Sequence, residues 1–113
     1  MSAYMIAHFD NLNQEKYEAW VPTVTPILFD HGAKILARNA TFELLDGSAR
    51  ASRFTILEFP DEAHARACFA SDEYQQVRGQ IRDSMNMVAM VLVPGVQSPQ
   101  PESVTEEAKE PAE

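Results

Sequence analysis

The sequence lacks several features that would point to common classes of function. It has one cysteine, Cys68, so no disulfide can form within the chain. No basic segment followed by an apolar stretch stands at the N-terminus, and no apolar run approaches the roughly 18 residues that a membrane span needs. We therefore expect a protein of a reducing compartment, in the cytoplasm, without a membrane partner.

Basic residues are also scarce. Lysine and arginine total 9 against 17 aspartates and glutamates, for a net charge of −8. No basic stripe is available to neutralise phosphates, so nucleic acid and anionic membrane surfaces are not expected partners. Glycine-rich phosphate loops, Gly-x-Ser-x-Gly elbows, Cys/His pairs and zinc-type spacings are missing as well. We expect no cofactor and no metal, and neither nucleotide nor acyl-enzyme chemistry.

The composition divides the chain into a domain over residues 1–96 and a tail over residues 97–113. The tail reads "QSPQPESVTEEAKEPAE", with three prolines, five glutamates and one large aliphatic residue, Val104. It cannot bury enough apolar area to offset the ordering of the chain, which predicts a disordered, solubilising appendage. A docking peptide is the alternative. The domain is long enough for a modest core.

Hydrophobic patterning predicts six main elements in the domain. Strands are expected over Ala3–Phe9, Ala33–Leu45, Ser52–Phe59 and Met85–Val93. Helices are expected over Asn13–His31 and, in two pieces, from Asp61 to Ser84. The order βαββαβ predicts a ferredoxin-like α+β domain, a four-stranded antiparallel sheet with its helices on one face.

Local signals refine these elements. Pro22 and Pro26 each remove a backbone donor, so we expect a kink or two helical pieces in the first helix. Gly32 is expected to end that helix, and Asp61 and Ser71 to cap the later helical pieces. The second strand is expected to bend or bulge near Asn39.

The last expected strand is apolar on both faces. Simple alternation puts Met85, Met87, Ala89 and Val91 on one face and Val88, Met90 and Leu92 on the other. A sheet face left to solvent should carry polar residues at every second position, and here it does not. The pattern predicts that a second copy covers this face, as a two-fold homodimer.

The stretch "SRFTILEFPDEAHARACFASDEYQ" is similar to the hallmark of the domain-of-unknown-function 1330 family, in the dimeric α+β barrel superfamily. The matching residues are Arg53, Glu58, Phe59, Pro60, Ser71, Glu73 and Tyr74. Glycines that the family carries after the first helix and in the second strand are replaced here by Ala33, Asn39 and Ala40. The resemblance implies the fold and the dimer. It implies no activity, although the superfamily includes cofactor-independent monooxygenases, muconolactone isomerases and haem-using proteins.

Charged residues inside expected strands are the strongest candidates for a site, because charges are rarely buried unpaired. Arg38 is expected to bind substrate and Glu58 to move a proton on the floor of an apolar pocket. A structural ion pair, between neighbouring elements or across the dimer, is the alternative. Tyr74 is a candidate to orient a substrate oxygen, or its hydroxyl satisfies a backbone group. His8 is a candidate general base, with haem ligation by His8 or His31 a weaker alternative.

Arg82 is the last substrate-binding candidate. It lies four residues after Arg78, and a late arginine of the family matches it when counted from the last strand. The pair is expected to bind a carboxylate ligand, or else to pair with Glu73 or Asp83. Cys68 is expected to be a buried small hydrophobe.

Two functions remain open from the sequence. The first is a small-molecule-binding module, with or without cofactor-independent monooxygenase- or isomerase-like chemistry, for a small organic acid or aromatic metabolite. The second is a non-catalytic homodimer that serves as a structural or partner-binding unit.

Overall fold

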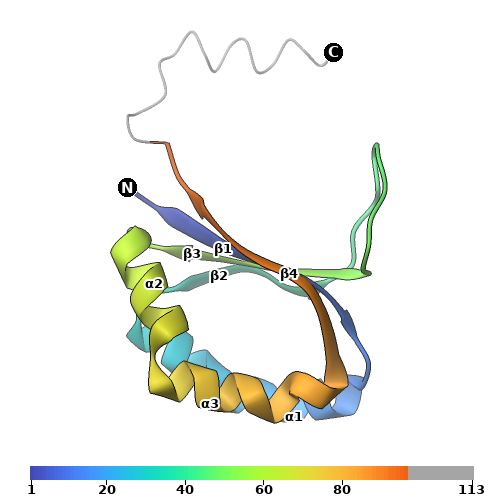
Figure 1. Ribbon diagram of the computed structural model, residues 1–113, viewed down its shortest axis with the longest axis horizontal. Coiled ribbons are helices and arrows are strands. Elements are labelled where there is room, and N and C mark those ends of the chain that lie inside the picture. Colours follow the sequence, from blue (N-terminus) through green and yellow to red (C-terminus); the bar gives the residue numbers. More distant parts are fainter. Residues whose placement is uncertain (97–113) are drawn as a thin grey trace, which may run out of the picture.

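The computed structural model describes residues 1–96 as a single sheet with all helices on one side (Figure 1). The strands are β1 (Ala3–Asn11), β2 (Lys34–Ala40), β3 (Arg53–Phe59) and β4 (Met85–Pro94). The helices are α1 (Gln14–Asp30), α2 (Glu62–Ala70) and α3 (Asp72–Ile81), followed by a short 3-10 turn, η1 (Arg82–Ser84). The predicted order βαββαβ is confirmed.

The strands lie in the order β2-β3-β1-β4, and each neighbouring pair is antiparallel. This is the ferredoxin-like arrangement expected from the sequence. In β1 every second residue is buried: Ala3, Met5, Ala7 and Phe9. These side chains point toward the helices, on what we call the covered face. The residues between them lie on the other side, the open face, which no element of the described chain covers (Figure 1).

Helix α1 begins at a cap and runs without a break. The Asn13 side chain accepts a hydrogen bond from the Lys16 amide, and the helix continues to Asp30. Of the two predicted alternatives, the division into two pieces is therefore wrong, and a kink within the single helix stays a prediction. Pro22 and Pro26 are both exposed, so water can satisfy the backbone groups they leave free, while burial of Val24 and other residues holds the helix to the sheet.

The other predicted helix boundaries are confirmed. Gly32 adopts φ of +87° after α1, and its amide bonds the Phe29 carbonyl. Asp61 caps α2 through the His64 amide, and Ser71 caps α3 through the Tyr74 amide.

The second strand is shorter than predicted. It ends at Ala40 rather than Leu45, and residues 41–52 form an arm that rises beside the open face (Figure 1). The expected irregularity near Asn39 is confirmed, because this residue has φ of +48° and the register with β3 shifts on both sides of Ala37. A left-handed residue followed by a shift in register turns the chain out of the sheet before Leu45.

A β-bulge in β4 corrects the predicted faces of that strand. His8 pairs with Ala89 but Phe9 pairs with Met87, which leaves Val88 as an extra residue. The extra residue reverses the alternation, so Met87 joins the covered face while Ala89 stays on the open face. Simple alternation had placed these two residues together.

Two further predictions concern membrane-spanning segments and the C-terminal tail. Within residues 1–96, no helix has the length and apolar composition needed to cross a membrane. The predicted tail over residues 97–113 lies outside the described residues.

Candidate functional site

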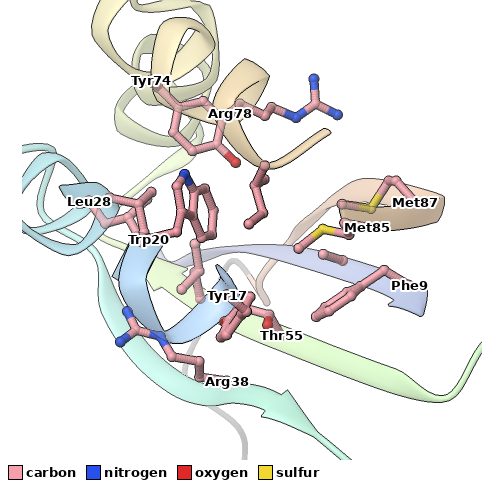
Figure 2. Close-up of a pocket in the computed structure, with 14 residues that line it drawn as sticks. Phe9, Tyr17, Trp20, Leu28, Arg38, Thr55, Tyr74, Arg78, Met85 and Met87 are labelled. Carbon is pink, nitrogen blue, oxygen red and sulfur yellow. The ribbon is translucent and has the colours of Figure 1, made fainter. Parts of the chain in front are cut away.

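A small cavity lies between the covered face and the helices (Figure 2). Its volume is about 70 Å³, and most of its lining is apolar. The apolar lining residues are Ala7, Phe9, Trp20, Val24, Leu28, Leu57, Ile81, Met85 and Met87. The polar lining residues are Tyr17, Arg38, Thr55, Tyr74 and Arg78. Apolar walls with a few polar groups are typical of ligand sites, although this volume lies below their usual range of roughly 300–1,000 Å³.

Three of the polar groups meet where α1 crosses β2 and β3. Arg38 donates from Nη2 to Thr25 Oγ1 at 2.9 Å, and Thr25 donates in turn to the Val21 carbonyl at 2.7 Å. Burial raises the pKa of the Tyr17 phenol, and the Arg38 charge and the Thr55 hydroxyl offset part of that rise. Like any phenol near neutral pH, Tyr17 keeps its proton and is a hydrogen-bond donor close to the Arg38 charge.

The opposite wall is supplied by α3. Tyr74 is buried, and burial raises the pKa of its phenol to about 12 against the opposing effect of Arg78. Trp20 donates its Nε1–H to the Val77 carbonyl at 2.7 Å, which ties α1 to α3 across the cavity. Figure 2 shows Arg38 and Arg78 on opposite sides of the cavity, with their guanidinium groups directed outward from its centre.

The charged residues at the cavity all have one sign. Arg38 and Arg78 line it, and Arg82 joins Arg78 at an adjoining hollow of about 60 Å³ beside Met85 and Met87. Within residues 1–96, no carboxylate lines either space. The ion pairs found within residues 1–96 are Asp61–His64 and Glu62–Arg66, and neither includes these arginines. The charged side chains that line these two spaces within residues 1–96 are all arginines, which favours an anion as the ligand.

Glu58 lies on the other face of the sheet. It pairs across the strands with Tyr4 and Lys34, and it accepts a hydrogen bond from the Ser2 hydroxyl at 2.6 Å. Arg38 lines the cavity on the covered face, so within the described chain these two residues form neither a shared pocket floor nor an ion pair. The reason is register: β2 and β3 turn the two side chains to opposite faces. An ion pair across a dimer stays a prediction.

His8 is also on the open face, and the backbone occupies both of its ring nitrogens. The Ala51 amide donates to Nε2 at 3.1 Å, so Nδ1 carries the proton and donates to the Arg53 carbonyl, also at 3.1 Å. The ring stacks on Phe54 with centroids 4.2 Å apart. In this arrangement His8 holds the base of the arm and has no free lone pair for a base or a metal.

The structure therefore divides the five predicted site residues. Arg38, Tyr74 and Arg82 lie at the cavity or its adjoining hollow, whereas Glu58 and His8 lie on the open face. Sequence reasoning missed Tyr17 and Thr55 as site residues. Thr55 had a signal: it is the polar residue in register with the inward-facing Leu57 and Phe59.

Two other predicted features can be located. Cys68 is fully buried, and burial raises the pKa of its thiol to about 11, so it is a core residue as expected. Among the described residues, no group of three or more histidine, cysteine, aspartate or glutamate side chains is arranged to hold a metal ion.

The fold and the cavity define a ferredoxin-like α+β protein with a small, mostly apolar cavity that Arg38 and Arg78 border. The chain belongs to the DUF1330 family, a domain of unknown function, whose model matches residues 2–96. No curated protein matches the sequence.

Solved structures show the same fold at low sequence identity. A protein of unknown function from Rhodopseudomonas palustris matches with a TM-score of 0.63 and 16% identity, over 86% of this chain and 84% of that chain. A structure of the same protein in methylated form matches with a TM-score of 0.61 and 16% identity, over 88% of this chain and 84% of that chain. HapK from Hahella chejuensis matches with a TM-score of 0.58 and 12% identity, over 88% and 97%. At these identities the likeness concerns the fold.

Proposed function

We propose that the domain binds a small organic anion, a carboxylate, in the cavity between the sheet and the helices. The observation that carries this proposal is the lining, in which all charged residues are arginines and none has a carboxylate partner within residues 1–96. Arg38 uses one of its five N–H donors on Thr25, which leaves donors for a ligand. The hydroxyl groups of Tyr17 and Tyr74, which line the cavity, supply further donors.

Binding is better supported than proton-transfer catalysis. The lining has no carboxylate and no imidazole, and its two tyrosines have raised pKa values, which makes them poor bases near neutral pH. The predicted proton-moving groups, Glu58 and His8, are on the other side of the sheet. A monooxygenase- or isomerase-like reaction in this cavity would have to proceed without them.

Calorimetric titration with small monocarboxylates (acetate, butanoate and benzoate) tests the proposal, with the corresponding primary amides as neutral controls. We expect the acids to bind and the amides not to. Arg38→Met and Arg78→Met should each weaken binding about 10- to 100-fold, the usual effect of losing a hydrogen bond to a charged group. Arg50→Met, on the exposed arm, is the matched control and should leave affinity unchanged. Equal binding of acids and amides would refute an anion site.

The open face favours a second proposal, a homodimer through the sheet. Large apolar residues are exposed there, with Leu36 at 52%, Val91 at 44% and Val93 at 40%, and Leu45 of the arm at 86%. A second copy, related by a two-fold axis, is the simplest closed way to bury such a face. This dimer would also serve the alternative function, a structural or partner-binding unit without a ligand. Cytoplasmic localisation stays a prediction.

Sedimentation equilibrium tests the dimer. Ile56 lies at the centre of the open face, paired with Ile6. Ile56→Asp should raise the dimer dissociation constant at least about 100-fold, since it would place an unpaired charge in the interface. Phe29→Asp is the control, because Phe29 is 56% exposed on α1, away from the open face. A wild-type chain that stays monomeric at high concentration would contradict the proposal.

A further inference from the structure

A second hollow borders the cavity and has no role in the function proposed so far. It lies between α2 and the outer strand β4, with a volume of about 400 Å³. Its lining is apolar except for one arginine: Met5, Ala65, Arg66, Phe69, Ala70, Met90, Val91 and Leu92. We call it the outer hollow and the cavity of about 70 Å³ the inner cavity. The small residues Ala65 and Ala70 leave this space open on the helix side.

The floors of the two spaces are formed by neighbouring residues. Met5 lines the outer hollow and Ala7 lines the inner cavity, two residues apart on the same face of β1. Met90 of the outer hollow pairs directly with Ala7. The two spaces therefore adjoin along the covered face.

Two aromatic rings separate the spaces. Phe69 lines the outer hollow and Tyr74 lines the inner cavity, with ring centroids 5.9 Å apart. The Arg78 guanidinium lies over the Phe69 ring, 5.1 Å from its centroid. Phe69 is only half-buried and packs against the edge of the core. The Arg78 side chain therefore lies at the boundary between the inner cavity and the outer hollow.

The volumes of the inner cavity and the outer hollow indicate the size of the ligand that the two spaces could hold. The inner cavity has room for a head group but falls below the range of about 300–1,000 Å³ usual for ligand sites, whereas the outer hollow lies within that range. An anion confined to the inner cavity would leave the apolar outer hollow beside it, with its volume of about 400 Å³, unoccupied. A ligand with an anionic head and an apolar body matches both spaces.

We infer that the ligand is an amphiphilic monocarboxylic acid, with its carboxylate at the arginines of the inner cavity and its aliphatic chain passing Phe69 into the outer hollow. This inference rests on the proposed anion site and adds the chemical class of the ligand. The occupant of the outer hollow is the chain of that acid, because the hollow is apolar, adjoins the cation-lined cavity and meets it at Arg78.

The test is a calorimetric titration of the full chain with straight-chain acids from acetate to octanoate. Once the chain is long enough to enter the outer hollow, each added methylene should tighten binding about fourfold, which corresponds to about 0.8 kcal/mol of burial. Ala70→Trp should fill the hollow and abolish that gain while butanoate binds as before. Ala67→Trp, on the same helix but exposed and outside the lining, is the matched control and should keep the gain. Ala70→Leu replaces the tryptophan variant if that variant does not fold.

The outcomes separate the two proposals. If no acid of any length binds, the anion site itself is wrong, and this inference fails with it. If short acids bind through Arg38 and Arg78 but length brings no gain, or Ala70→Trp leaves the gain intact, only the inference is overturned. If Ala70→Trp instead changes the sedimentation of the free protein, the hollow is an interface between copies, which also overturns the inference.

Discussion

The two faces of the sheet are built from the same strands but differ in what they expose. The covered face carries Ala7, Phe9 and Leu57 against the helices and holds Arg38, which has no acidic partner within residues 1–96. The open face carries apolar side chains at the surface, together with Glu58 and His8, whose polar atoms are engaged by Ser2 and by the backbone. A charge without a partner beside an apolar cavity suggests a ligand, whereas an apolar face with satisfied polar groups suggests a protein partner.

The largest expected effect compares one leucine on each face. Leu57→Ala should lower the free energy of unfolding by about 2–5 kcal/mol, because Leu57 is buried in the core under the helices. Leu36→Ala, at a position 52% exposed on the open face, should change it by only about 0.5 kcal/mol in dilute protein.

Urea unfolding at several protein concentrations measures both effects. If the open face is a dimer interface, the cost of Leu36→Ala should grow with concentration, while that of Leu57→Ala should stay constant. Equal costs for the two variants in dilute protein would mean that the faces do not differ as described.

An intermediate effect concerns Tyr74 of α3, which is buried on the side of the covered face. Its pKa is raised from 10.0 to about 12, so the folded state holds the phenol proton more tightly than the unfolded state does. This contribution is fully present below pH 10 and is lost as the pH rises to about 12. Over that window the free energy of unfolding should fall by on the order of 2–3 kcal/mol.

Tyr74→Phe should remove that part of the alkaline loss of stability, as measured by urea unfolding across the same pH range. Tyr4→Phe, on the open face, is the matched control and should keep it. An identical alkaline profile in wild type and Tyr74→Phe would show that the phenol is not buried as described.

The smallest effect concerns the base of the arm beside the open face. Asp10 accepts hydrogen bonds from the Ser52 amide at 2.9 Å and the Ser52 hydroxyl at 2.8 Å, and these bonds lower the pKa of its carboxyl. Asp10→Ala should speed hydrogen exchange of the Ser52 amide with little change in melting temperature. Because the pKa is lowered, protection in the wild type should persist as the pH falls to 3.8 and be lost below it.

Glu43→Ala, farther out on the arm, should leave Ser52 exchange unchanged. Unchanged exchange in the Asp10→Ala variant would mean that Asp10 does not hold the arm.

Much of the fold was predictable because its signals are local. Asp61 and Ser71 satisfy free amides at the start of helices, Gly32 takes a left-handed conformation, and period-2 burial identifies β1. The errors arose where a nearby element decides the outcome. Residues 14–30 of α1 stay in one helix across two prolines because packing against the sheet offsets the missing donors. Strand β2 ends at Ala40 because of backbone conformation, although apolar residues continue to Leu45.

The candidate site was predictable only in part. By itself the sequence determined which residues are charged within strands and that Cys68 and Tyr74 belong to apolar helix faces. It also determined that the domain has one sheet with its helices on one face. Only the tertiary structure decided which face each polar residue occupies. The register of β2 and β3 separates Arg38 from Glu58, and the bulge at Val88 turns Met87 into the cavity. In a sheet, a shift of one residue moves a side chain to the opposite face, and that shift depends on pairing between strands distant in the chain.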